Sequence, residues 1–195
     1  MKTIEPVVIG GSAGAVEALT AILPRLPSTL GTAVAVVVHM GPQDPGLLPG
    51  LFAARCQMQV REARDKEPLA GGVIYFAPVD YHLMIERDVT FSLSCDNAVN
   101  YSRPSIDVLF ESVAESFGKH SIGVLLTGMG RDGTAGLARI KERGGFAVVQ
   151  DPASAEGQIM PRSAIASVAV DKVLPLAEIA PFLVELCAGQ RSKAW

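Results

Sequence analysis

The sequence predicts an α/β fold in which helices cover both faces of a doubly wound, mostly parallel sheet. Three times, a short run of β-branched residues leads through a glycine-rich or polar turn into a helical pattern; these runs are PVVIG (6–10), AVAVVVH (33–39) and IGVLLT (122–127). Continuous apolar strands that alternate with helices are typical of a parallel sheet covered on both sides. Because 49% of the 195 residues are hydrophobic, we expect a single domain with a sizeable core over residues 1–195.

Each of these strands ends at a turn, and a helix follows the turn. Glycines at 10–14 end the first strand, and a helical pattern follows over about 14–25. The turn MGPQDPG leads to a helix at about 45–55, and GMGRDG leads to one at about 133–143. FAVVQ (146–150) is then a further buried strand. Glycine and proline favour turns over regular structure, so these boundaries are the clearest in the chain.

The remaining helices are expected before the third strand and at the end of the chain. Helical patterns cover 105–117, 161–169 and 175–188. The first of them has Pro104 at its start, where a missing N–H costs little.

The middle of the chain differs from the rest. Four strand-like pieces lie between residues 58 and 94 with short connections: MQVREA, VIYFAP, YHLMIE and VTFSLS. We interpret them as a small antiparallel extension of the sheet, with a hairpin that turns near Arg87 and Asp88.

Composition excludes several classes of protein. The net charge is −3 and no basic stripe is present, which argues against nucleic-acid binding. Cys56, Cys95 and Cys187 are dispersed and form no CxxC pair, so neither a disulfide framework nor a zinc site is expected.

Targeting signals are also missing from the pattern. Glu5 and Pro6 interrupt the N-terminal apolar run, which is therefore a strand and not a signal peptide. Within the uncharged stretch 26–43, only 33–38 is truly apolar, too short for a membrane span. We expect a cytoplasmic protein without membrane insertion.

The first glycine loop has the pattern G-x-S-x-G at Gly10, Ser12 and Gly14. In this motif a sharp strand-to-helix turn exposes a nucleophilic serine, and the helix N-terminus offers N–H groups to an oxyanion. A tight turn with a serine N-cap is the alternative, and the five-residue pattern alone does not separate the two.

The second glycine loop, Gly128 to Gly133, matches the dinucleotide fingerprint G-x-G-x-x-G. It follows a strand and opens a helix, and Asp151 ends the next strand about 20 residues on, as the fingerprint requires. Asp132 argues against this interpretation because its carboxylate would face a pyrophosphate, although Arg131 could relieve the repulsion. A dinucleotide-binding oxidoreductase and a purely structural turn both stay open on this pattern.

Parallel-sheet topology brings three residues of the right chemistry together. Ser12, His39 and Asp132 each follow the carboxyl end of a predicted strand, and these ends share one edge of the sheet, where ligands bind. His120 precedes its strand and therefore lies at the opposite edge, and His82 lies in the middle region. A Ser–His–Asp triad is recognised by geometry and not by chain order, so the sequence predicts a nucleophilic site here.

Six segments together resemble the catalytic domain of the CheB-type protein-glutamate methylesterases of bacterial chemotaxis. They are VVIGGSAGAVEAL, VVVHM, VIYFAPVDYHLMI, RPSIDVLFESVA, GVLLTGMGRDGTAGL and QIMPRSAI, which run from about residue 6 to 170 in the order of the family. The resemblance implies a cofactor-free esterase that acts on glutamyl methyl esters of chemoreceptor cytoplasmic helices, often with glutamine deamidase activity.

The resemblance also implies roles for individual residues. The family's nucleophile falls on Ser12, its base on His39 and its orienting carboxylate on Asp132. The oxyanion donors fall on the backbone N–H of Met129 and, as the second donor, that of Ala13. A groove for the substrate chain is expected to involve Met129 and two further residues, for which core packing and a solvated charge are the alternatives: Met160 and Arg162.

Two departures from the family pattern are visible. Ala15 stands where the family commonly has glycine, which could tighten the approach of a substrate or shift the helix start. A receiver domain usually precedes the catalytic domain, whereas this chain starts at the first strand, so it is either part of a longer protein or a stand-alone enzyme. A catalytically silent module that docks to receptors is the remaining alternative to an active hydrolase.

Overall fold

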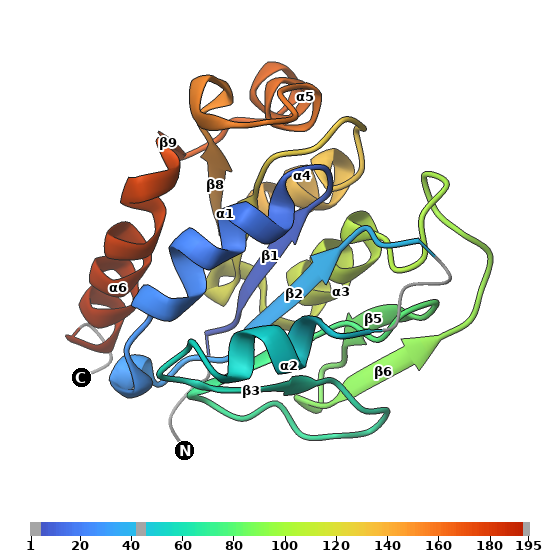
Figure 1. The fold of residues 1–195 in the computed structure, drawn as a ribbon, viewed down its shortest axis with the longest axis vertical. Helices are drawn as coiled ribbons and strands as arrows, with labels where there is room; N and C mark the ends of the chain where they lie inside the picture. Colours follow the sequence, from blue (N-terminus) through green and yellow to red (C-terminus); the bar gives the residue numbers. More distant parts are fainter. Residues whose placement is uncertain (1–4, 42–45, 193–195) are drawn as a thin grey trace.

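The computed structural model describes residues 5–41 and 46–192 of the chain and shows a sheet of seven strands between two helical layers (Figure 1). The strand order is β3-β4-β2-β1-β7-β8-β9, and every neighbouring pair is parallel. The strands are β1 (Val7–Gly11), β2 (Val34–Val38), β3 (Gln59–Glu62), β4 (Val73–Phe76), β7 (Ile122–Leu125), β8 (Phe146–Gln150) and β9 (Lys172–Leu174). The predicted fold class is therefore confirmed.

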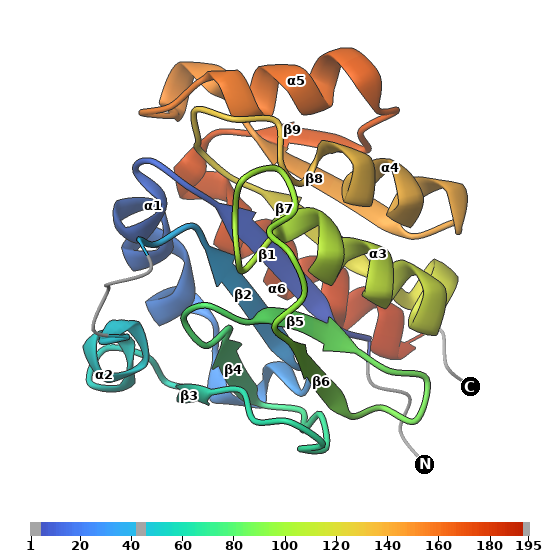
Figure 2. The same ribbon diagram turned by 90° about the vertical axis from the view of Figure 1, so that its right-hand side faces the viewer.

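Helices cover both faces of this sheet (Figure 2). One face carries α1 (Ala15–Ile22), α2 (Leu48–Ala53) and α6 (Leu176–Ser192); the other carries α3 (Ile106–Phe117), α4 (Thr134–Glu142) and α5 (Ile159–Ser167). Four short 3₁₀ turns complete the helical elements: η1 (Leu23–Arg25), η2 (Ser28–Leu30), η3 (Gly118–His120) and η4 (Pro152–Ser154). None of the helices in the described ranges has the length and apolar character needed to cross a bilayer.

The central strands are buried on both sides, as the continuous apolar runs predict. Every residue of β1 and β2 is buried, and alternate side chains enter different layers. Val7 and Ile9 pack with α1 and α6, whereas Val8 packs with α3 and α4. Sheet and helices thus form one continuous core on each face of the sheet.

The middle region corrects part of the prediction. Only β5 (His82–Ile85) and β6 (Phe91–Ser94) form an antiparallel hairpin, which turns through 86–90 as expected. β3 and β4 instead join the main sheet as parallel strands, so the expectation that all four pieces are antiparallel is wrong. The reason is burial: all four residues of β4 are buried and three of them, Ile74 to Phe76, pair with β2, and such a strand requires cover on both faces.

The hairpin is fastened to α3 by two serine hydroxyls. Ser112 Oγ accepts the N–H of Ile85 at 3.0 Å, and Ser116 Oγ donates to the carbonyl of Ile85 at 2.8 Å. These bonds satisfy backbone groups of β5 that have no strand partner on that side. The hairpin is thereby held against the C-terminal half of α3.

The carboxyl ends of three strands define the place where a site is expected. The chain enters the sheet at β1 in its centre, adds β2 on one side and later adds β7 on the other. This reversal of direction is a topological switch point, and ligands of α/β sheets bind in the crevice beyond it.

Candidate functional site

Ser12 and His39 follow neighbouring strands at this edge. In the register of the sheet, Gly11 of β1 lies opposite Val38 of β2. Ser12 follows β1 and His39 follows β2, so these two residues leave the sheet side by side. The N–H of His39 donates to the carbonyl of Gly11 at 3.1 Å. On the other side, the N–H of Ser12 donates to the carbonyl of Thr127, just after β7, at 2.9 Å. The serine loop therefore stands between the ends of β2 and β7.

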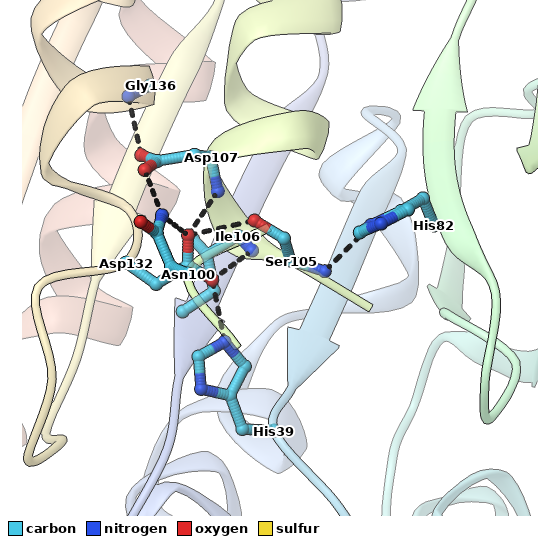
Figure 3. A network of polar contacts seen from close by, with 8 residues as sticks. All are labelled: His39, His82, Asn100, Ser105, Ile106, Asp107, Asp132 and Gly136. Carbon is cyan, nitrogen blue, oxygen red and sulfur yellow. Dashed lines mark hydrogen bonds and ion pairs between the residues drawn. The ribbon is translucent and has the colours of Figure 1, made fainter. Parts of the chain in front are cut away.

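His39 is paired with Asp132 across the end of β1. The distance from His39 Nε2 to Asp132 Oδ2 is 2.7 Å, and the Asp132 side chain is only 2% exposed (Figure 3). A carboxylate accepts and does not donate, so Nε2 carries a proton and the neutral ring has its lone pair on Nδ1. Between Ser12 Oγ and His39 the structure shows no hydrogen bond in the part of the chain that it describes.

Asp132 also caps the N-terminus of α3, a role that its position in the glycine loop did not predict. Its Oδ2 accepts the N–H of Ile106 at 2.6 Å, and its Oδ1 accepts the N–H of Asp107 at 3.1 Å. The hydroxyl of Ser105 donates to Oδ1 at 2.8 Å instead of capping its own helix. A carboxylate from the loop before α4 thus caps the N-terminus of α3, where the helix dipole is positive and the first N–H groups have no partner within the helix.

These bonds hold Asp132 in its charged form. Burial by itself would raise the pKa of this carboxyl, but hydrogen bonds from His39, Asn100 and the backbone of α3 outweigh burial and lower the pKa from 3.8 to about 2. The side-chain amide of Asn100 donates to Oδ1 at 2.9 Å. Asp132 therefore keeps a negative charge beside His39 at every pH near neutrality.

A second buried carboxyl, Asp107, shares Asn100 with Asp132 (Figure 3). Asn100 Nδ2 donates to Asp107 Oδ2 at 2.7 Å, and the N–H of Gly136 donates to Asp107 Oδ1 at 2.7 Å. Burial and then the charge of Asp132 raise the pKa of Asp107 to about 6, although the bonds from Gly136 and Asn100 act against that rise. Two neighbouring carboxyls are thus separated in pKa by their surroundings.

This separation predicts a pH-dependent stability. Because the folded state raises the pKa of Asp107 from 3.8 to about 6, folding favours the protonated acid. Its contribution to stability is complete below the unfolded pKa and is lost as the pH rises through about 6. We expect the melting temperature of Asp107→Asn, minus that of the wild type, to increase between about pH 5 and pH 7.5. Thermal melts at a series of pH values measure it, and a difference that does not vary with pH contradicts it.

The other two histidines lie outside the pair formed by His39. His82 is buried; its Nδ1 accepts the N–H of Ser105 at 3.2 Å and its Nε2 donates to the carbonyl of Asn97 at 3.2 Å, so it supports the start of α3. His120 follows α3 at the other edge of the sheet, as expected, with its Nδ1 2.8 Å from Glu5 Oε1.

The loop around Ser12 is shaped by Thr127. The Thr127 hydroxyl donates to the carbonyl of Ala13 at 2.8 Å and accepts the N–H of Gly157 at 2.7 Å. The N–H of Ala13 and that of Met129 donate to no acceptor within the described residues. Gly14 begins α1 with φ 76°, a left-handed conformation that glycine adopts without strain. Two free backbone donors therefore accompany the serine loop.

The two residues proposed for a substrate groove have different surroundings. Met160 is fully buried, and a Cβ at Gly128 would lie 2.7 Å from Met160 Sδ, so Met160 packs beneath the second glycine loop. The expectation that Met160 lines a groove is wrong, because its side chain does not reach the surface. Arg162 is exposed and donates to Oε1 of Gln158, the N-cap residue of α5, at 2.9 Å. Its contact with a substrate stays a prediction.

Packing explains two of the three glycines of the dinucleotide fingerprint, Gly128 and Gly133, whereas a Cβ at Gly130 would meet nothing within 4 Å. A Cβ at Gly133 would lie 2.5 Å from Leu125 Cδ1 and 2.8 Å from Ile106 Cγ2. The Asp151 carboxylate, which would have to bind a ribose, instead accepts the N–H of Ala153 at 2.9 Å and caps η4. Close packing thus explains why residue 133 is glycine, and Asp151 already has a backbone partner. Neither feature needs a nucleotide, so the geometry does not favour the oxidoreductase alternative.

Sequence reasoning missed three members of this network: Asn100, Ser105 and Asp107. Ser105 precedes a predicted helix, which is a signal for an N-cap but not for a bond to a distant carboxylate. Asn100 and its neighbour Tyr101 have φ values of 52° and 63°. Left-handed backbone is common for asparagine and unusual for tyrosine, at a cost of order 1–3 kcal/mol where it is strained.

Comparison with known proteins places this arrangement in a family. The model of the CheB methylesterase family matches residues 7–183. A Leptospira interrogans relative is 48% identical over 182 residues, which are 93% of this chain and 94% of the relative. A protein of Anaeromyxobacter dehalogenans named protein-glutamate methylesterase/protein-glutamine glutaminase 2 is 43% identical over 183 residues, which are 94% of this chain and 53% of that protein.

A solved structure agrees with the sequence relatives. The crystal structure of the Thermotoga maritima CheB methylesterase catalytic domain superimposes with a TM-score of 0.91 at 35% identity, and the match covers 94% of this chain and 99% of that one. Several relatives are about twice as long as this chain, which spans 50% to 55% of their length in five cases. On the family model, the sequence relatives and the fold together, the chain belongs to the CheB methylesterase family.

Proposed function

We propose that this protein is a serine hydrolase that removes the methyl group from glutamyl 5-methyl esters of chemoreceptors or related signalling proteins. The observation that carries the proposal is the His39–Asp132 pair at 2.7 Å, with a buried carboxylate and a partly exposed imidazole, beside a serine that follows the neighbouring strand. Relatives named protein-glutamate methylesterase/protein-glutamine glutaminase support the substrate class and add glutamine deamidation. Residues 1–195 act as one catalytic domain, and the reaction takes place in the cytoplasm, where the receptor helices lie.

Acylation begins at Ser12. Nδ1 of His39 takes the proton from Ser12 Oγ while Oγ attacks the ester carbonyl carbon. The oxyanion that forms is held by the free N–H groups of Met129 and Ala13, which need no reorganisation because Thr127 holds the loop through its hydroxyl. We expect the hydrogen bond from Ser12 Oγ to His39 Nδ1 to form when substrate binds, since catalytic hydrogen bonds often tighten only in the complex with substrate.

The loss of methanol completes acylation, and deacylation then uses the same groups with water as the nucleophile. When the tetrahedral intermediate collapses, the carbon–methoxy bond breaks and the imidazolium of His39 gives its proton to the leaving oxygen, so methanol departs. A water molecule then loses a proton to His39 as it attacks the acyl-enzyme, and Ser12 regains the proton when free glutamate forms. With a glutamine substrate, ammonia takes the place of methanol.

Asp132 stabilises the cation that both steps create. Its pKa of about 2 keeps it charged, and its bond to Nε2 fixes the tautomer that leaves Nδ1 as the base. The carboxylate cannot rotate, because α3 and Asn100 bind it from the other side.

Replacement of His39 and of His120 by glutamine distinguishes the proposed base from a histidine outside the site. His39→Gln should lower kcat for ester hydrolysis by about 10³-fold or more, because glutamine can still donate to Asp132 but cannot accept the serine proton. His120→Gln is the matched control: this residue lies at the other edge of the sheet beside Glu5, and kcat should stay within about twofold of wild type. Equal losses in the two variants, measured as initial rates, would show that the wrong histidine has been chosen.

The function itself is tested with a receptor cytoplasmic fragment that carries methyl-esterified glutamates. Incubation with the protein should release methanol and restore free glutamate, as read by mass spectrometry of the fragment. A fluorophosphonate should add to the protein once, at Ser12.

Two outcomes would favour the alternative functions. A protein that binds the fragment but forms no adduct and releases no methanol would be the silent docking module. A heat signal on titration with NAD(H) would favour the oxidoreductase.

A further inference from the structure

The two central residues of a tight turn after the hairpin differ in their surroundings: the Asn100 side chain bonds to Asp132, and the Tyr101 side chain is fully exposed. Val99 and Ser102 exchange two backbone hydrogen bonds, of 3.1 and 3.0 Å, and enclose Asn100 and Tyr101. Both central residues have positive φ, 52° and 63°, as in a type I′ turn. The loop that carries the turn projects from the body of the molecule beyond β6 (Figure 1).

One side of the turn is anchored in the proposed catalytic network. Asn100 Nδ2 donates to Asp132 Oδ1 at 2.9 Å and to Asp107 Oδ2 at 2.7 Å (Figure 3). Asp132 in turn holds His39 at 2.7 Å. The turn is therefore attached directly to the carboxylate that would orient the catalytic base. Tyr101, the other central residue of the turn, follows Asn100 in the chain and so lies near the proposed site.

The base of the same loop is also held. The Arg103 guanidinium donates to the carbonyls of Cys95 and Asp96 at 2.7 and 3.0 Å. It also donates to Asp80 Oδ1, at 2.9 Å from Nε and 2.7 Å from Nη2. Anchors at the tip and at the base make the turn a rigid support, so its outer residue is presented in a defined direction.

That outer residue, Tyr101, has no structural reason to be a tyrosine. Its side chain is fully exposed, with a relative accessibility of 103%, so it contributes no burial to the fold. A type I′ turn prefers glycine after asparagine, because only glycine adopts the left-handed conformation without strain. Val99, in the same turn, is also 38% exposed. A strained, exposed aromatic on a rigid support beside a catalytic group is typical of a recognition element.

We propose that Tyr101 is a specificity-determining contact for the protein substrate: its ring packs on the helix that carries the methyl-esterified glutamate while the ester enters the site at Ser12. The inference rests on the proposed function and names a residue that selects a protein over a small ester. Tyrosine suits this role, since it offers a large apolar surface and a hydroxyl with few rotatable bonds to restrain. A small ester has no helix to reach the ring and does not use this contact.

Two substrates measured with the same enzyme test the proposal. They are the methyl-esterified receptor fragment and the γ-methyl ester of N-acetylglutamate amide, and the quantity of interest is the ratio of their kcat/KM values. Tyr101→Ala should lower this ratio at least about tenfold, mainly through KM for the fragment, as loss of an aromatic hot spot does. Tyr101→Phe should keep most of it. Val173→Ala, an exposed apolar residue of the edge strand β9, is the control and should leave the ratio unchanged.

The outcomes separate this inference from the proposed function. A ratio in Tyr101→Ala equal to that of the wild type would overturn the substrate contact. Equal losses on both substrates would also overturn it, since they would show that the residue acts on the catalytic groups through Asn100. Wild-type protein that hydrolyses neither ester would overturn the proposed function, and this inference with it. Tyr101→Gly adds a readout of the fold: it should melt at a higher temperature than the wild type, because glycine relieves the positive φ.

Discussion

Ser12→Ala should abolish ester hydrolysis while the protein stays folded. Removal of the nucleophile lowers kcat by a factor of at least about 10³, because the oxyanion donors and the base then have no oxygen to act upon. The fold has little dependence on the hydroxyl: the N–H of Ser12 still donates to Thr127 and its carbonyl still accepts from Ala15, since both bonds belong to the backbone. Methanol release measures the first effect, and a thermal melt measures the second.

A fluorophosphonate provides an independent check of the same variant. The wild type should gain the mass of one adduct and Ser12→Ala should gain none. If the variant hydrolyses the glutamyl methyl ester at a rate comparable to the wild type, Ser12 has no part in the mechanism. If the variant instead melts far below the wild type, the loss of activity reports unfolding and the backbone argument for Ser12 is wrong.

Asp132→Asn should lower both activity and stability, because one carboxylate binds the proposed base, His39, and also caps α3. Five donors converge on its two oxygens, from His39, Asn100, Ser105 and the N–H groups of Ile106 and Asp107. An amide has only one oxygen, so either orientation turns an NH₂ group against at least two of these donors. We expect kcat to fall by about 10⁴-fold, as when a triad loses the correct tautomer, and the free energy of unfolding to fall by about 3 kcal/mol.

Asp151→Asn is the matched control for this variant. Asp151 also follows a strand of the sheet, but its carboxylate only caps η4, and asparagine caps equally well. Rates and urea unfolding of the two variants should therefore separate clearly. An Asp132→Asn protein with wild-type stability would mean that Asp132 does not cap α3, and one with wild-type kcat would remove it from the mechanism.

Some features of this protein follow from the sequence alone. The apolar runs at β1, β2 and β7 predict a parallel sheet, and a parallel sheet has one edge at which all carboxyl ends lie. Ser12, His39 and Asp132 could be selected for that reason, from three loops far apart in the chain. Local pattern and strand polarity are sufficient for this step because they do not depend on which helix packs against which.

Other features depend on contacts between distant segments. Whether β3 and β4 extend the parallel sheet, and whether Met160 is buried beneath Gly128, follow from packing that no local pattern encodes. The same holds for the bonds of Asn100 and Ser105 to Asp132, since short polar side chains most often bond to their own backbone neighbours.

The sequence by itself thus determined that Ser12, His39 and Asp132 stand at the carboxyl edge of the sheet, because strand direction alone assigns them to it. Only the tertiary structure decided how those groups are held. The loop before α4 lies at the N-terminus of α3, and the Asp132 carboxylate accepts the free N–H groups of that helix. A buried charge persists only where donors from several elements converge on it, and such convergence exists only in the folded chain.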